Sequence, residues 1–111
     1  MVNAEWDVQL SKEVEKWFRG LNQLDRLRAR RAIHLLETRG PYLGMPHSKS
    51  LGEGLLELRF TCEDVHRRIT YYFDPTRRAI TLTTFRKQRQ NEQNEVKRAK
   101  QAMLKSKRQE G

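Results

Sequence analysis

The stretch from Leu51 to Lys87 constrains the fold more than any other part of the chain, because apolar and polar residues alternate along it. Three runs, at 56–61, 68–73 and 80–83, place an apolar residue at every second position. This period is typical of strands that bury one face. We therefore expect three strands that pair as consecutive hairpins in one sheet.

Two short polar segments suit the turns of this sheet. Glu63 and Asp64 separate the first two runs, and Asp74-Pro75 separates the last two. Aspartate readily starts a type I turn, and proline presets the backbone of its second residue. We expect tight connections at both places.

The polar residues of these strands form the first candidate site. Side chains at positions i and i+2 of a strand share a face, so Arg59, Arg68 and Tyr72 are expected opposite the apolar residues of their strands. The sheet would then present a positive, hydroxyl-bearing outer surface. Arg86 and Lys87 follow the last run and extend this basic character.

The part of the chain before the three runs predicts one strand and two helices. Residues 5–10 alternate polar and apolar side chains. Residues 12–21 follow Ser11, a good N-cap, and have the apolar spacing of an amphipathic helix. A second helix is expected to begin after Asn22 and to end at Gly40-Pro41.

Residues 40–54 contain four Gly, two Pro and two Ser, and are expected to form a loop. His47 and Lys49 lie in it, where a rigid sheet could present them to a ligand. The second helix carries several arginines, which we interpret as a solvated face, with an RNA contact as the alternative. These are Arg26, Arg28, Arg30 and Arg31.

The C-terminal end changes in composition. From Arg86 to Gly111 there are nine basic and three acidic residues, and a thin apolar stripe runs through Val96, Ala99 and Met103. We expect a basic helix over about 90–111, partly packed and frayed at its end, rather than an RNA-tracking arm. The whole chain, 1–111, is expected to form one domain.

The net charge of +9 and the pI near 10.2 favour a polyanionic partner, with nucleic acid ahead of an acidic protein. The single Cys62 cannot form an internal disulfide, which predicts a reducing compartment. The first residues lack the pattern of a secretory leader, and no run approaches the roughly 20 apolar residues of a membrane span. We expect a cytoplasmic protein with no membrane partner.

No nucleotide, metal or acyl-transfer motif is present, and the three histidines lack ligand spacing, so we expect neither a cofactor nor a metal. The basic sheet face suits phosphodiester chemistry, because guanidinium groups bind phosphate oxygens and stabilise the charge of a pentacovalent phosphorane. In RNA the 2′-hydroxyl supplies the nucleophile. His47, Lys49, Tyr72 and Lys87 remain open as general base or acid, and a purely binding role for Arg59 and Arg68 remains equally open.

Three segments resemble a known family. Residues 46–59 (PHSKSLGEGLLELR), 68–72 (RITYY) and 85–88 (FRKQ) closely resemble the phage-derived Gp49-like branch of HigB toxins. These toxins belong to the RelE/ParE superfamily of type II toxin–antitoxin systems. The resemblance extends over nearly the whole chain and implies a compact α+β fold, of order β-α-α-β-β-β-α, with a helical hairpin packed on a mostly antiparallel sheet.

The resemblance also implies an activity and partners. It implies a metal-independent endoribonuclease that cleaves mRNA in the ribosomal A site by 2′-hydroxyl attack. The partners are the ribosome, its message and a cognate helix-turn-helix antitoxin, through which operator DNA is contacted. Among family-type residues, Arg59, Arg68 and Lys87, joined by Tyr72 from the sheet face, are the expected catalytic set. The expected RNA- or ribosome-binding set is His47, Lys49, Arg67, Arg86 and Arg89.

The sequence departs from the family pattern in three places. Arg86 and Gln88 replace paired lysines, residues 90–93 lack the usual proline, and the C-terminal end lacks a catalytic Tyr or His. The general base is therefore unassigned. Two other functions stay open: a ParE-like gyrase poison, and a non-catalytic basic module that binds nucleic acid or acts as a co-repressor.

Overall fold

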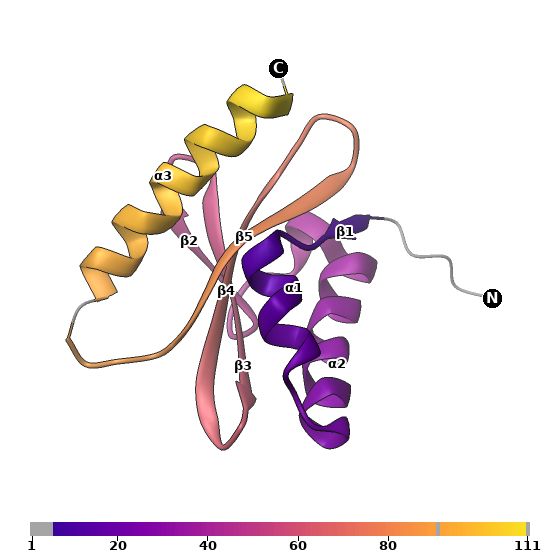
Figure 1. Cartoon of the computed structure of the whole chain (residues 1–111). Coiled ribbons are helices and arrows are strands. Elements are labelled where there is room, and N and C mark those ends of the chain that lie inside the picture. The colour runs from indigo at the N-terminus through magenta and orange to yellow at the C-terminus, as the bar shows by residue number, and fades with distance from the viewer. Residues whose placement is uncertain (1–5, 91, 111) are drawn as a thin grey trace.

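The computed structural model describes residues 6–90 and 92–110. In chain order the elements are β1 (Asp7–Gln9), α1 (Lys12–Arg19), α2 (Gln23–Arg39), the 3-10 turn η1 (Gly40–Tyr42), β2 (Ser48–Gly52), β3 (Leu55–Cys62), β4 (Val65–Phe73), β5 (Arg78–Arg86) and α3 (Glu92–Glu110). The strands form one sheet in the order β1-β5-β4-β3-β2. Only β1 and β5 run parallel. Figure 1 shows α1 and α2 on one face of this sheet and α3 on the other, which confirms the α+β class.

The two N-terminal helices begin where the sequence predicts. The hydroxyl of Ser11 accepts the backbone N–H of Val14 at 3.2 Å, and the side chain of Asn22 accepts that of Asp25 at 2.8 Å. Each bond satisfies one of the free N–H groups at a helix start. Gly40 ends α2 at φ 52°, and a Cβ at this position would clash with the indole of Trp6. Glycine is therefore required there.

The three predicted strands and both turns are confirmed as β3, β4 and β5. Glu63 and Asp64 both have positive φ, 57° and 59°, and join β3 to β4 as a two-residue hairpin. Asp74 starts the connection to β5, where its carboxylate accepts the backbone N–H groups of Thr76 and Arg78 at 2.9 and 3.0 Å. These contacts are the physical reason for an aspartate at that turn.

The prediction that residues 40–54 form only a loop is wrong. Ser48–Gly52 forms the edge strand β2, which pairs antiparallel with β3 and is interrupted by a bulge between Ser50 and Gly52. Because of the bulge and the small residues, this segment lacks the regular alternation of apolar and polar residues that marks a strand. The predicted order therefore lacked one strand. The predicted first strand also included Glu5, which lies outside the described residues.

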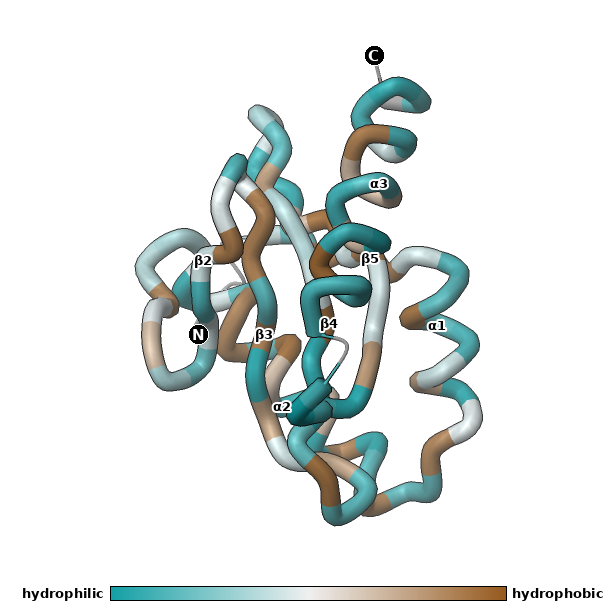
Figure 2. The backbone as a smooth tube through the Cα atoms, turned by 90° about the vertical axis from the view of Figure 1, so that its left-hand side faces the viewer, coloured by the Kyte–Doolittle hydropathy of each residue, from teal (hydrophilic) through white to brown (hydrophobic). Residues whose placement is uncertain are grey.

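The main core lies between the sheet and the helical hairpin. Val14 and Leu36 from the helices pack against Leu58, Ile69 and Tyr71 from the sheet, and all are buried. Burying an aliphatic or aromatic side chain of this size stabilises the fold by about 1.5–3 kcal/mol. The hydropathy colouring alternates along the central strands, as two differently covered faces require (Figure 2).

The opposite face is half covered by α3. Val96, Ala99 and Met103, the predicted apolar stripe, pack against a second cluster of sheet residues. A bulge in β5 helps to form that cluster, because the register shifts between the pairs Ile69–Thr84 and Tyr71–Thr81. Both Tyr72 and Leu82 lie under the helix. The sheet face is therefore only partly open to solvent.

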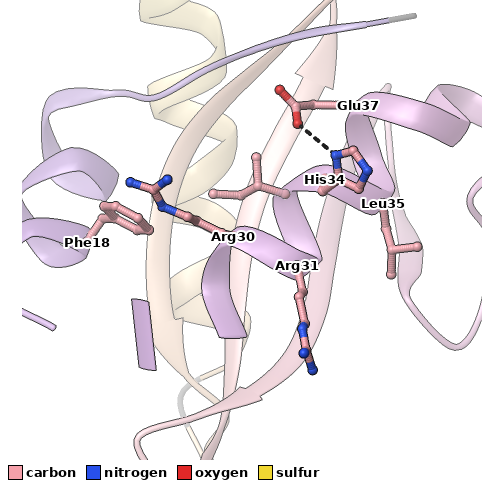
Figure 3. Close-up of a pocket in the computed structure, with 7 residues that line it drawn as sticks. Phe18, Arg30, Arg31, His34, Leu35 and Glu37 are labelled. Atoms are coloured by element: carbon pink, nitrogen blue, oxygen red, sulfur yellow. Dashed lines mark ion pairs between the residues drawn. The ribbon is translucent and has the colours of Figure 1, made fainter. Parts of the chain in front are cut away.

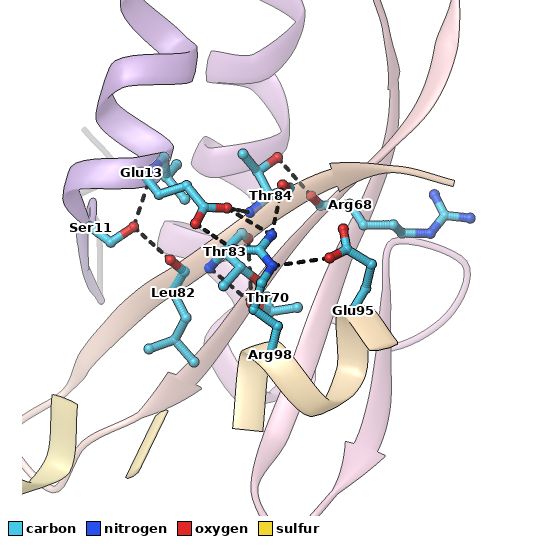
Figure 4. A network of polar contacts seen from close by, with 10 residues as sticks. Ser11, Glu13, Arg68, Thr70, Leu82, Thr83, Thr84, Glu95 and Arg98 are labelled. Atoms are coloured by element: carbon cyan, nitrogen blue, oxygen red, sulfur yellow. Dashed lines mark hydrogen bonds and ion pairs between the residues drawn. The ribbon is translucent and has the colours of Figure 1, made fainter. Parts of the chain in front are cut away.

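A polar network fastens α3 to the rest of the fold (Figure 4). The guanidinium of Arg98 donates to both carboxylate oxygens of Glu13 in α1, at 2.6 and 3.0 Å, and to Glu95 at 3.0 Å. These bonds raise the pKa of Arg98. Glu13 also accepts the backbone N–H of Thr84 in β5 at 2.8 Å. Within the described ranges, no helix is long and apolar enough to cross a membrane.

Candidate functional site

A cluster of charged residues lies on the same sheet face as α3, beyond the sheet residues that pack against this helix. Arg59 of β3 lies directly opposite Arg68 of β4, so the two side chains share one face. Glu57 lies two residues before Arg59 and faces Lys49 of β2. On the other side of β4, Phe85 of β5 lies opposite Arg68. Four strands thus bring residues from distant parts of the chain to one surface.

Lys87 extends this surface beyond the end of β5. Its backbone N–H donates to the carbonyl of His66 at 2.7 Å, which continues the β4–β5 pairing by one position. By alternation with Phe85, Lys87 lies on the side of Arg68. We call this surface the arginine face. It comprises Lys49, Glu57, Arg59, Arg68, Phe85 and Lys87.

A buried carboxylate lies between the two arginines. Glu57 is 8% exposed, and its Oε2 lies 3.4 Å from Nε of Arg59 and 3.6 Å from Nε of Arg68. Arg68 is itself only 4% exposed, and its Nη1 donates to the carbonyl of Arg67 at 3.2 Å. A single carboxylate therefore holds two guanidinium groups side by side without neutralising both.

Burial shapes the acid–base properties of this triad. It raises the pKa of Glu57, and the nearby charges of Arg68 and Arg59 oppose this only in part. Burial lowers the pKa of Arg68, and the like charge of Arg59 adds to the effect. Guanidinium groups stay charged at any physiological pH. The result is a carboxylate better suited to accept a proton near neutral pH than an exposed glutamate is, next to permanent positive charge.

Tyr72 does not lie on the open surface that the sequence predicts. It is on the α3 side of β4, but it is 3% exposed under the helix. Its hydroxyl lies 2.8 Å from Oγ of Ser106, and Nζ of Lys107 lies 5.3 Å from its ring centre. The stripe on α3 indicated a packed helix, but its thinness gave no sign of which sheet face the helix would cover.

The other predicted binding residues are spread over several surfaces. Arg67 lies on the opposite sheet face, where its guanidinium stacks 4.8 Å from the Trp17 ring and donates to Glu63 at 3.1 Å. Arg86 is paired with Arg67 in register and shares that face. Arg89 is exposed after β5. His47 precedes β2 and lines a separate cavity between α2 and β3.

Glu57 is the residue that the sequence prediction missed. An acidic residue on the polar face of a strand is usually solvated, and no motif distinguished this one. The available signal was its position in the alternation, two residues before Arg59 and across from a strand that carries Arg68. Strand pairing was needed to show that one carboxylate serves both arginines.

A second concave surface lies on the helical hairpin, away from the arginine face. A groove of 780 Å³ is lined by Phe18, Arg30, Arg31, Ile33, His34, Leu35 and Glu37. Figure 3 shows Arg30 pointing toward Phe18, whereas Arg31 points away from it. An adjoining hollow of 640 Å³ contains Leu24 and Leu27, which are 57% and 48% exposed, beside Arg26. Exposed apolar residues ringed by arginines are typical of a binding surface.

Comparison with known proteins agrees with the resemblance seen in the sequence. Residues 16–104 match the family described as "Phage derived protein Gp49-like". Over 79 residues the chain is 38% identical to a candidate toxin, HigB3, of Mycobacterium tuberculosis (strain ATCC 25618 / H37Rv). The aligned region covers 68% of each of the two chains. The residues that match the family model include α1 from Lys16 onward, all of α2 and every residue of the arginine face. The chain therefore belongs to the phage-derived Gp49-like family of HigB toxins.

Proposed function

We propose that this protein is the toxin of a type II toxin–antitoxin system and that it cleaves mRNA on the ribosome. The observation that carries the proposal is the Arg59–Glu57–Arg68 triad, a proton acceptor held between two fixed cations. Such a set matches what RNA cleavage by 2′-hydroxyl attack requires. It supplies a base for the nucleophile and positive charge for the phosphorane.

In the proposed reaction Glu57 accepts the proton of the 2′-hydroxyl while that oxygen attacks the adjacent phosphorus. The O2′–P bond forms and the P–O5′ bond breaks, which leaves a 2′,3′-cyclic phosphate and a 5′-oxygen that must gain a proton. Arg59 and Arg68 stabilise the additional negative charge of the phosphorane. Lys87, at the edge of the same face, is the proposed donor or electrostatic partner of the leaving oxygen.

The remaining basic residues have binding roles in this proposal. Lys49 faces Glu57 from β2 and is suited to a flanking phosphate. Arg86 and Arg89, exposed near the end of β5, would contact ribosomal RNA. Arg67 is held by Trp17 and Glu63, so we assign it chiefly to packing. The ribosome would hold the message in line for attack, which the arginine face does not do alone.

A toxin of this class needs a cognate antitoxin, and the helical hairpin offers a surface for it. Leu24 and Leu27 are exposed on α2, and the guanidinium groups of Arg26 and Arg30 lie 5.8 and 5.7 Å from the Phe18 ring. This combination of apolar surface and positive charge is complementary to an amphipathic segment rich in acidic residues. We propose that the antitoxin binds there and blocks ribosome entry without contacting the arginine face.

The experiment that tests the catalytic proposal is a reconstituted translation reaction with purified toxin. We expect message cleavage only when ribosomes are present, and a loss of about 10²-fold or more for Arg68→Ala, in line with removal of one transition-state cation. The control Arg19→Ala removes an exposed charge from α1 and should cleave normally. Intact message with excess wild-type protein would exclude the interferase activity. Gyrase-dependent DNA damage would then favour the ParE-like alternative, and nucleic-acid binding alone the co-repressor.

The antitoxin surface is tested separately. Leu27→Glu places a negative charge in the exposed apolar patch and should abolish neutralisation while leaving cleavage intact. The matched control is Leu104→Glu, at an exposed leucine of α3. If both variants are neutralised like the wild type, the antitoxin binds elsewhere.

A further inference from the structure

The edge of the sheet next to the arginine face contains a cavity that the proposed cleavage reaction does not use. It has a volume of 260 Å³ and lies between α2 and the end of β3. Its floor is apolar and includes Ala32, Leu35 and Phe60. Its rim carries three arginines and a histidine, contributed by α2, β3 and the loop before β2. We call it the edge cavity.

The cavity exists because β2 is shorter than its partner. The pairing of β2 with β3 begins at Ser48 and Leu58, and the last contact beyond it is the N–H of Arg59 donating to the carbonyl of His47 at 2.8 Å. By strand alternation the backbone of Thr61 points to the same side, where no strand of the described chain continues. The edge therefore offers polar backbone groups next to an apolar floor.

The rim carries more positive charge than its acidic neighbours neutralise. Arg28 is held by Asp25 at 3.2 Å, and Arg59 shares Glu57 with Arg68. Arg31 is exposed and makes no hydrogen bond or ion pair with any residue that the structure describes. The side chain of His47 is half-buried at the same rim. An anionic ligand would complete the charges around this cavity.

Arg59 connects the edge cavity to the arginine face. Its Nε faces Glu57, while its Nη1 lies 3.4 Å from Sδ of Met45 in the loop before β2. One guanidinium thus borders both the triad and the cavity. An RNA strand whose phosphate is bound at the triad could continue past Arg59 into the edge cavity. The surface along this path is positive throughout.

We propose that the edge cavity is a nucleotide subsite for RNA, which holds one nucleotide next to the scissile phosphate. The base lies against Leu35 and Phe60, and Arg28 and Arg31 bind the phosphate beyond it. The cavity is below the roughly 300–1,000 Å³ of drug-sized ligand sites, which suits a single nucleotide. A mixed apolar and arginine lining matches the stacking and phosphate contacts by which proteins hold single-stranded RNA. This inference rests on the proposed function only for the identity of the RNA as substrate.

The test compares two neighbouring arginines of α2. Arg31→Ala removes a cation from the edge cavity, whereas Arg30→Ala removes the same charge from a guanidinium that points toward Phe18 (Figure 3). Binding of a fluorescent single-stranded RNA, methylated at its 2′-hydroxyls to prevent cleavage, is measured by anisotropy over a salt series. We expect Arg31→Ala to weaken binding about tenfold and to lower the salt slope by about 0.7, the value for one lost phosphate contact on a single strand. We expect Arg30→Ala to change affinity less than about twofold.

Several outcomes separate this inference from the proposed function. Equal losses for Arg30→Ala and Arg31→Ala, or no binding by the wild type at low salt, would overturn the subsite even if cleavage occurs. Loss of antitoxin binding in place of RNA binding by Arg31→Ala would also overturn it. Selective loss of RNA binding by Arg31→Ala, in a protein that cleaves nothing, would support the subsite and reject the interferase. Cross-linking of a 4-thiouridine in the same RNA to the peptide containing Phe60 and Thr61 would locate the base directly.

Discussion

At the scale of single residues, the most informative feature is the position of Glu57. A carboxylate that is 8% exposed normally requires strong compensation, and here two guanidinium groups supply it. The same arrangement keeps Arg59 and Arg68 close together despite their like charge. Removing Glu57 would leave the two guanidinium groups next to each other without the carboxylate that they share. The triad is therefore both a structural and a chemical unit.

The first prediction concerns the base. Glu57→Gln keeps the size of the side chain but cannot accept a proton, so cleavage should fall by about 10²–10⁴-fold. Because burial raises the pKa of Glu57, wild-type cleavage should decline as the pH falls through that pKa, and the variant should lose this dependence. Rates across a pH series measure both effects. Glu53→Gln, in the exposed β2–β3 turn, is the control, and an unchanged pH profile in Glu57→Gln would reject the assignment.

The second prediction concerns Tyr72, which the sequence analysis placed in the expected catalytic set. Its hydroxyl bonds to Ser106 under α3, so Tyr72→Phe should lower the free energy of unfolding by about 0.5–1.5 kcal/mol. Cleavage should stay within about twofold of the wild type. Urea unfolding and cleavage rates are the two measurements. A rate loss near 10²-fold in a folded Tyr72→Phe protein would instead support a role in proton transfer.

At the scale of helices and strands, α3 determines how much of the sheet face is open. It packs through a few small and flexible side chains and is fastened at its start by Arg98 and Glu13. Its first turn also brings Glu92 close enough for its charge to raise the pKa of Glu57 slightly further. The helix thus defines one border of the arginine face.

The third prediction concerns this packing. Met103→Ala should lower the free energy of unfolding by about 2–5 kcal/mol, because Met103 is buried against Leu55, Tyr72 and Leu82. Leu104→Ala, at the next and exposed position, should change it by less than about 0.5 kcal/mol. Chemical denaturation of both variants makes the comparison. Similar stabilities for the two would mean that α3 contributes little to the folded state.

The fourth prediction concerns the link between α2 and the β3–β4 turn. The N–H of Glu63 donates to Asp25, which lowers the pKa of this carboxylate despite its partial burial. A lowered pKa adds stability above the unfolded value near 3.9, and this stability is lost as the pH falls through the folded pKa. Asp25→Ala should therefore unfold at a lower temperature than the wild type at pH 7, with a difference that shrinks below about pH 4. Asp7→Ala is the control, and a constant difference across this range would contradict the account.

The sequence was sufficient to predict most helices and strands, but not how they pack against one another. Alternation in β3, β4 and β5 and the caps Ser11 and Asn22 are local signals, so these elements were predictable. The strand β2 was missed because its bulge breaks the alternation. The cover over Tyr72 and the pairing of Glu57 with two arginines depend on strand register and helix packing, which no local pattern encodes. The candidate site was therefore predicted as a basic face, without its carboxylate.

At the scale of the whole molecule, the fold separates two surfaces. Figure 1 shows α3 on one face of the sheet and the helical hairpin on the other. The arginine face lies on the α3 side of the sheet, and the exposed Leu24 and Leu27 belong to α2 of the hairpin. A net charge of +9 favours approach to RNA and makes binding sensitive to salt. In the proposed mode of neutralisation, an antitoxin bound to the helical hairpin leaves the arginine face intact. Regulation would then act on access to the ribosome rather than on the chemistry.

In the proposed mechanism the arginine face promotes attack by the 2′-hydroxyl of RNA. The most direct measurement is the chemistry of the fragment ends produced in a reconstituted translation reaction. We predict a 5′-hydroxyl on the downstream fragment and a 2′,3′-cyclic phosphate on the upstream one, both absent with Glu57→Gln. Fragments with 5′-phosphate ends would show that water, not the 2′-hydroxyl, is the nucleophile, and would rule out the proposed mechanism.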